Sequence, residues 1–305
     1  MRIAIIGIGG VGGYFGGKLA EAYATNGQHE IIFIARGEHL KAIQQNGLRL
    51  LTQEGSYVAW PNIATDDPAD LGIFDLIFFC VKSYSLECSA LALKGNIDKN
   101  TVIIPLLNGI NSAEKLHAIL PEADIVSGSV YIISRIESPG VVHQEGGACR
   151  LIFGTNDQES SLTYFNILNI LKRAGINATL TDKISEALWT KYLLMCPLAS
   201  LTSATGKTYG AILEDPDLQE RARNMMREVA LVGRAHHIVL PDDVVDKTMA
   251  MVGRFGYDSK TSMQLDREKG GQTEIDTLTV FLCRAAREAG IPTPLHDEVL
   301  RQLMD

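Results

Sequence analysis

Three glycines near the start of the chain have the spacing of a phosphate-binding turn. Gly7, Gly9 and Gly12 form the pattern G-x-G-x-x-G, directly after the apolar run 2–6 and directly before a helical pattern. Because glycine has no Cβ, the chain can turn tightly and its backbone can approach a pyrophosphate, which a helix N-terminus attracts. The alternative is a glycine-rich turn that binds nothing. The context favours a dinucleotide site made of Gly7, Ile8, Gly9, Gly10, Val11 and Gly12.

Arg36 follows the second predicted strand, residues 30–35. In a nucleotide-binding βαβ unit, the residue at this strand end meets the adenosine ribose of the cofactor. A carboxylate there would accept a hydrogen bond from the ribose of NAD, whereas a guanidinium suits a 2′-phosphate. Arg36 therefore predicts NADP(H) over NAD(H), the alternative being an arginine that only begins a surface loop.

Two further apolar runs, 75–81 and 101–106, are typical of central parallel strands that are covered on both faces. Lys82 follows the first run and Asn108 lies just after the second. Ligands of open α/β sheets bind at the carboxyl ends of the strands. We therefore expect Lys82 and Asn108 near the cofactor.

Lys191 lies in the middle of the strongly apolar helical run 184–198. Desolvation lowers the pKa of a lysine, so that it can give up its proton readily. Such a lysine could act as a general acid toward a ketone oxygen while a hydride arrives at the carbon. The alternative, a lysine that reaches water along its methylene stem, is equally compatible with the sequence.

Glu274 lies where a loop becomes a helix, so its carboxylate could cap that helix or take part in chemistry. Ser259 and Ser262 belong to the predicted helical segment 258–269. Their hydroxyls could bind a substrate carboxylate or hydroxyl, or only water.

Strands and helices alternate up to about residue 181, and long helical patterns follow. This predicts an α/β Rossmann domain over residues 1–181 and an all-α domain over 182–305. Two hairpins are expected, one from runs 48–51 and 56–59, the other from runs 141–144 and 150–153 across Gly146-Gly147. Asp215-Pro216 predicts the start of a long helix, with Asp215 as its N-cap.

The composition is that of an ordinary globular protein of 305 residues, with 46% hydrophobic and 21% charged residues. A net charge of -8 argues against nucleic acid or an anionic membrane as a partner. The five scattered cysteines favour free thiols in a reducing cytoplasm, and the seven histidines lack the spacing of metal ligands. With a strand at residue 2 and no membrane-length apolar run, we expect neither a secretory signal nor a membrane span.

Several motifs occur together and in order along the whole chain. They are the glycine loop, Arg36-Gly37, Val81-Lys82-Ser83, Leu107-Asn108-Gly109, Leu188-Trp189-x-Lys191 and Thr273-Glu274-Ile275-Asp276. In this combination the chain resembles the ketopantoate reductase (2-dehydropantoate 2-reductase) family. The resemblance implies reduction of ketopantoate to pantoate with NADPH, in the route to pantothenate and coenzyme A. It also implies a Rossmann domain, a helical domain like the C-terminal one of 6-phosphogluconate dehydrogenase, and an active site between them.

The resemblance also implies roles for individual residues. Lys191 matches the family's proton donor, and Glu274 the carboxylate that orients the substrate and contacts the cofactor. Lys82, Asn108 and Ser134 match cofactor-side positions, and Ser262 matches a substrate-binding serine.

Four positions depart from the family pattern. Met195, Ala199 and Tyr209 stand where the family usually has asparagines, and Ser85 where a glutamine is common. Met195 and Ala199, with Lys191, Ser259 and Ser262, would line the substrate site. Lost amides mean lost polar contacts, so a different branched 2-oxo acid is a second hypothesis. A third is a non-catalytic protein that senses NADP(H), and a homodimer is compatible with each.

Overall fold

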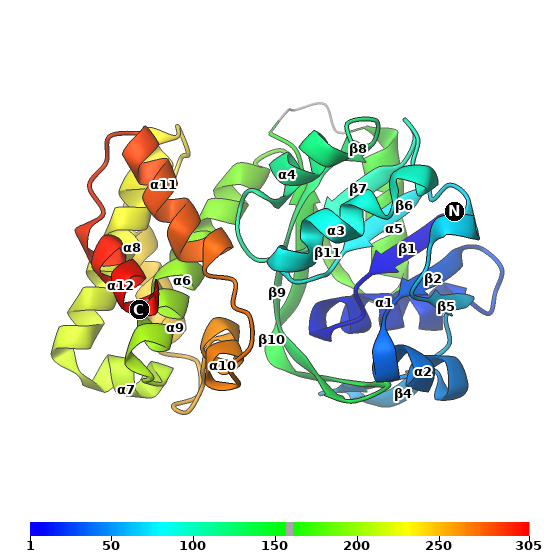
Figure 1. Ribbon diagram of the computed structural model, residues 1–305, viewed down its shortest axis with the longest axis horizontal. Helices are drawn as coiled ribbons and strands as arrows, with labels where there is room; N and C mark the ends of the chain where they lie inside the picture. Colours follow the sequence, from blue (N-terminus) through cyan, green and yellow to red (C-terminus); the bar gives the residue numbers. More distant parts are fainter. Residues whose placement is uncertain (157–160, 305) are drawn as a thin grey trace. The chain divides into compact units, whose positions relative to one another are not determined.

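The chain forms two compact units in a computed structural model that describes residues 1–156 and 161–304 (Figure 1). The first, here called the α/β unit, contains residues 1–107 and 111–184. The second, the helical unit, contains residues 185–305 together with the short segment 108–110. Asn108, which immediately follows the α/β segment 1–107, therefore packs with the helical unit.

The α/β unit is built on a six-stranded parallel sheet with the order β5-β2-β1-β6-β7-β8. Its strands in that order are β5 (Ile63–Thr65), β2 (Glu30–Ile34), β1 (Arg2–Ile6), β6 (Leu76–Phe79), β7 (Val102–Pro105) and β8 (Asp124–Ile125). The order runs outward in both directions from β1, which is the arrangement of a Rossmann fold. The predicted parallel sheet is therefore confirmed.

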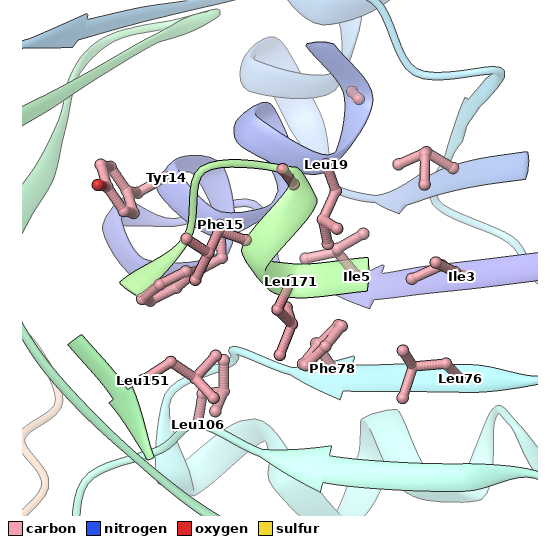
Figure 2. Close-up of a cluster of buried hydrophobic side chains, with 14 of the residues drawn as sticks. Ile3, Ile5, Tyr14, Phe15, Leu19, Leu76, Phe78, Leu106, Leu151 and Leu171 are labelled. Carbon is pink, nitrogen blue, oxygen red and sulfur yellow. The ribbon is translucent and has the colours of Figure 1, made fainter. Parts of the chain in front are cut away.

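Both faces of this sheet are buried. Ile3 and Ile5 of β1 point into one apolar cluster, and Ala4 and Ile6 into another on the opposite face. Figure 2 shows side chains of β1 and β6 meeting those of α1 in the first cluster. The helices of the unit are α1 (Gly10–Tyr23), α2 (Gly37–Asn46), α3 (Leu86–Leu91), α4 (Ser112–Ile119) and α5 (Leu162–Arg173), with short 3-10 turns at Ala69–Leu71, Ser83–Ser85 and Lys94–Asn96.

A second sheet has the order β11-β10-β3-β4, with β9 paired to β10. These strands are β3 (Leu48–Thr52), β4 (Gly55–Ala59), β9 (Ser127–Ser138), β10 (Val141–Gly154) and β11 (Asn177–Thr181). The hairpin expected from runs 48–51 and 56–59 is confirmed as β3 and β4.

The other predicted hairpin, between runs 141–144 and 150–153, is wrong. Both runs belong to the single strand β10, which pairs antiparallel with β9. Gly146 and Gly147 make no chain reversal but lie where the register with β9 shifts. Gly147 has a φ of +84°, and a Cβ there would lie 2.9 Å from the Cα of Ile132, so the glycine pair permits an irregularity inside a continuous strand.

The helical unit consists of seven α-helices and one π-helical segment among the described residues. They are α6 (Ile184–Thr205), α7 (Tyr209–Glu214), α8 (Pro216–Ala235), α9 (Val244–Val252), α10 (Ser262–Glu268), the π-helical η4 (Asp276–Val280), α11 (Phe281–Glu288) and α12 (Pro294–Met304). Asp215 caps α8 as predicted, because its Oδ1 accepts from the backbone N–H groups of Asp217 and Leu218. In residues 1–156 and 161–304, none of the helices combines the length and apolarity that a bilayer span requires.

Helix α6 is the first helix of the helical unit and carries Lys191. It runs on through Pro197 to Thr205, seven residues beyond the apolar run 184–198. Most of its second half is buried in the core of the unit, and the hydroxyl of Ser200 donates to the carbonyl of Cys196, at 2.7 Å. Tertiary packing thus maintains the helix across a residue that normally interrupts one.

Candidate active site

The ammonium of Lys191 lies against the amide side chain of Asn108. Lys191 is half-buried on α6, and its Nζ donates to the Oδ1 of Asn108 at 3.0 Å. Burial lowers the pKa of Lys191 from 10.5 to about 8, and the charge of Glu274 opposes that shift. The prediction of a desolvated lysine is therefore confirmed over a lysine that extends into bulk water.

Asn108 links Lys191 to Glu274. While its Oδ1 accepts from Lys191, its Nδ2 donates to the Oε2 of Glu274 at 3.3 Å. Glu274 is only 3% exposed. The two hydrogen bonds require opposite ends of the amide, so they fix its orientation and place an ammonium and a carboxylate on either side of it.

Two local features hold this group together. Gly109 has a φ of +96°, and a Cβ there would lie 2.2 Å from the Cγ2 of Thr277, so only glycine lets the segment after Asn108 approach η4 so closely. The hydroxyl of Tyr192, the neighbour of Lys191, donates to the carbonyl of Leu278 at 2.5 Å. Both contacts tie the segment after Glu274 to the other members of the site.

Glu274 itself precedes η4, where its backbone carbonyl accepts from the N–H groups of Thr277 and Leu278. Its side chain, in contrast, bonds to Asn108. The sequence left open whether this carboxylate only caps the following helix. In the structure it also bonds to a side chain outside that helix, Asn108. We name Lys191, Asn108 and Glu274 the proton-transfer group.

The glycine loop of the α/β unit has the geometry that a phosphate requires. Gly7 has a φ of +92°, and a Cβ on Gly12 would lie 2.0 Å from the carbonyl oxygen of Gly7. A Cβ on Gly10 would lie 2.2 Å from the carbonyl oxygen of Ser134. Gly9, in contrast, has open space where its Cβ would be. Gly7, Gly10 and Gly12 are thus required by the local backbone, whereas the open space at Gly9 leaves an approach to the start of α1.

The N-terminus of α1 leaves its backbone donors to a ligand. Its N-cap is Gly9, which offers no side-chain cap, and the first turn contains no acidic residue. The first N–H groups of a helix lack partners within the helix and favour an anion. Residues 7–12 therefore fit the pyrophosphate of a dinucleotide.

The other predicted cofactor residues lie around this loop or follow the strands as expected. Arg36 is exposed and is the N-cap of α2, two residues beyond the end of β2. Lys82 follows β6 and is half-buried, with interactions of its own. Ser134 lies on β9 beside Gly10, and its hydroxyl is buried without a hydrogen-bond partner among the described residues.

The predicted substrate residues differ in their surroundings. Met195 is half-buried one turn after Lys191, whereas Ala199 is 1% exposed and belongs to the apolar core. Ser262 is exposed at the start of α10. The backbone carbonyl of Ser259 accepts from the backbone N–H of Tyr209 at 3.0 Å, so the structure brings these two positions together. Within the described chain, hydrogen bonds connect neither serine to Lys191.

Tyr209 packs against an aromatic partner. Its ring stacks on that of Phe255, with centroids 5.2 Å apart, and burial raises the pKa of Tyr209 to about 12. Sequence reasoning did not find the roles of Phe255 and Tyr192, because each is one of several aromatic residues in apolar stretches and the partners are distant in sequence.

Comparisons with known proteins cover both units. The family model described as ketopantoate reductase PanE/ApbA matches residues 3–158, and its C-terminal companion matches residues 183–305. A 2-dehydropantoate 2-reductase of Mesorhizobium japonicum is 30% identical, over 98% of this chain and 96% of the relative. A Bacillus subtilis protein described as the uncharacterized oxidoreductase YkpB is 25% identical, over 99% and 98%.

Solved structures with the same fold include members of this family. A PanE/ApbA family ketopantoate reductase from Ralstonia eutropha is 31% identical, with a TM-score of 0.87 over 100% of this chain and 99% of that one. A D-mandelate dehydrogenase, solved with NADH and anilino(oxo)acetate, shares the fold at 23% identity and a TM-score of 0.88, over 100% and 97%. Since the family models match most of the chain, the protein belongs to the ketopantoate reductase family, a family of oxidoreductases.

Proposed function

We propose that this protein reduces the C2 ketone of a branched 2-oxo acid to a hydroxyl with NADPH, and that Lys191 donates the proton. Ketopantoate, the substrate in the family's name, is the reference substrate, and its reduction would place the enzyme in the route to pantothenate. The observation that carries the proposal is the Lys191–Asn108–Glu274 group, with an ammonium whose pKa is near 8.

The reaction needs two additions to one carbonyl group. Reduced nicotinamide, when bound, supplies the hydride that adds to the carbonyl carbon. Lys191 first donates a hydrogen bond to the carbonyl oxygen, which increases the positive character of the carbon, and then gives that oxygen its proton. The product is an alcohol, and Lys191 regains a proton from water before the next turnover.

Asn108 and Glu274 prepare Lys191 for this step. The amide holds Nζ at one position and, among the described residues, takes one of the three ammonium N–H groups, so that the other two would serve the substrate and water. The nearby carboxylate favours the protonated form of Lys191, which burial alone would disfavour. Lys191 is therefore charged at neutral pH and yet acidic enough to give up its proton during turnover.

The choice of NADPH rests on Arg36. An exposed guanidinium two residues after β2 suits a 2′-phosphate, with which it would form charge-assisted bonds. Residues 7–12 would hold the pyrophosphate, and Lys82 and Ser134 would bind nearer the nicotinamide. The family resemblance alone leaves NADH open, since the D-mandelate dehydrogenase structure contains it.

The test is steady-state NADPH oxidation, followed by absorbance, with ketopantoate and other branched 2-oxo acids. General acid catalysis contributes roughly 10²- to 10⁴-fold, so Lys191→Ala should lower kcat by that factor while NADPH still binds. Lys207→Ala, which removes an exposed lysine of the same unit, is the matched control.

Unchanged turnover in Lys191→Ala would remove this lysine from the mechanism. Tight NADPH binding without oxidation by any 2-oxo acid would instead favour the sensor hypothesis. A cytoplasmic location and a homodimer stay predictions, and sedimentation of the purified protein tests the second.

A further inference from the structure

The residues that flank Lys191 along its own face of α6 are apolar and only partly buried. Beyond Lys191, Met195 is the one residue of positions 192–203 that is not buried. On the other side, Leu188 is half-buried as well. Residues at 188, 191 and 195 share one face of a helix. Lys191 therefore lies in a half-buried stripe between two apolar side chains.

Met195 faces this stripe and not the core. The apolar core of the helical unit, as the described residues define it, contains Leu193, Leu194 and Cys196 but not Met195. Side chains on a helix lean toward its N-terminus, so that Met195 leans over the turn that carries Lys191. A molecule that binds at Nζ and extends toward the C-terminal end of α6 meets the Met195 thioether.

We infer that Met195 selects a 2-oxo acid whose side chain is branched, apolar and without a hydroxyl. This inference rests on the proposed function and narrows its substrate class. A thioether has no hydrogen to donate and is only a weak hydrogen-bond acceptor. A hydroxyl buried against Met195 would leave water without gaining a partner, which disfavours it, whereas a methyl group loses nothing.

The experiment compares two substrates that differ by one oxygen atom. Ketopantoate carries a hydroxyl that 3,3-dimethyl-2-oxobutanoate lacks, and the two are otherwise identical. For the wild-type enzyme with NADPH, kcat/KM should favour the deoxy compound roughly 10- to 100-fold, the discrimination that an apolar pocket achieves against an added hydroxyl.

Two variants test whether Met195 is responsible. Met195→Gln keeps the length and lack of branching but adds an amide, so the ratio of kcat/KM values should move toward ketopantoate by roughly tenfold. Met195→Leu keeps the surface apolar and should retain the wild-type preference. NADPH affinity, measured for each protein, confirms that the α/β unit is intact.

The outcomes separate the two proposals. A wild-type preference for ketopantoate, or equal ratios in Met195→Gln and Met195→Leu, would overturn this inference and leave the proposed function standing. Absence of NADPH oxidation with both compounds would overturn the proposed function, and the inference with it.

Discussion

Replacing Lys191 by methionine should stabilise the folded protein at neutral pH although it removes the proposed acid. Methionine preserves most of the volume of lysine without a charge. The folded state lowers the pKa of Lys191 from 10.5 to about 8, which means that folding disfavours its charged form. Each pKa unit corresponds to about 1.4 kcal/mol, so this gap amounts to about 3 kcal/mol.

Two losses offset part of that gain. The hydrogen bond from Nζ to Asn108 contributes about 1 kcal/mol, and the Oδ1 left without a donor costs about 1 kcal/mol more. At pH 7 the Lys191→Met protein should therefore be more stable than the wild type by about 1 kcal/mol, or about 2–4 °C in Tm.

The pH dependence of stability tests separately whether the Lys191→Met substitution stabilises or destabilises the protein. Below pH 8 Lys191 is protonated in both states, and the full penalty is present. Between pH 8 and 10.5 the folded state loses this proton while the unfolded state keeps it, so the stability of the wild type rises with pH. Above that range Lys191 is neutral in both states, so the cost of burying its charge no longer applies. Only the two losses at Asn108 remain, and the variant should be less stable than the wild type by about 2 kcal/mol.

Scanning calorimetry of both proteins from pH 7 to 10.5 measures this crossover, and Lys207→Met, at an exposed position, should show no such change. If the stability difference between Lys191→Met and wild type stays constant across that range, the desolvation of Lys191 is not what sets its pKa, and the reasoning fails.

Three further predictions concern pH and the cofactor. With the reaction above, kcat should fall as the pH rises past about 8, because Lys191 then loses the proton it must donate, and a flat profile to pH 9.5 would contradict its role as acid. Arg36→Ala should weaken NADPH roughly 10- to 100-fold and NADH hardly at all, as isothermal titration measures; equal losses for both would remove the 2′-phosphate contact. Gly12→Ala places a Cβ 2.0 Å from the Gly7 carbonyl and should lower both Tm and NADPH affinity, whereas Gly9→Ala, with nothing within 4 Å, should lower affinity alone; a lowered Tm in both would mean that the loop has no open side.

Local sequence patterns predicted the parallel sheet, because buried strands and the glycine turn carry their signals within a few residues. They failed for β10, since its register with β9 depends on pairing that no local pattern encodes. A glycine pair signals a turn in most contexts, and only the proximity of Gly147 to Ile132 shows why it lies inside a strand here.

In the candidate site, too, some features could be predicted from the sequence and others could not. Lys191 and Glu274 are identifiable by chemical type and context, and family resemblance strengthens both. Their connection through Asn108 is not identifiable from spacing, because Asn108 is 83 residues from Lys191 and 166 from Glu274. Asn108 was expected beside the cofactor, and its bonds to the two other members of the proton-transfer group became visible only in three dimensions.

The position of Asn108 also limits where this chain can be joined to a related one to make a functional chimera. A C-terminal cassette beginning at residue 185 would carry Lys191 and Glu274 but leave their connecting amide behind, since residues 108–110 pack with that half while lying early in the chain. A chimera of two related enzymes joined there would pair the lysine of one parent with the asparagine loop of the other. Grafting residues 108–110 together with the cassette should therefore rescue chimeras that a single crossover inactivates.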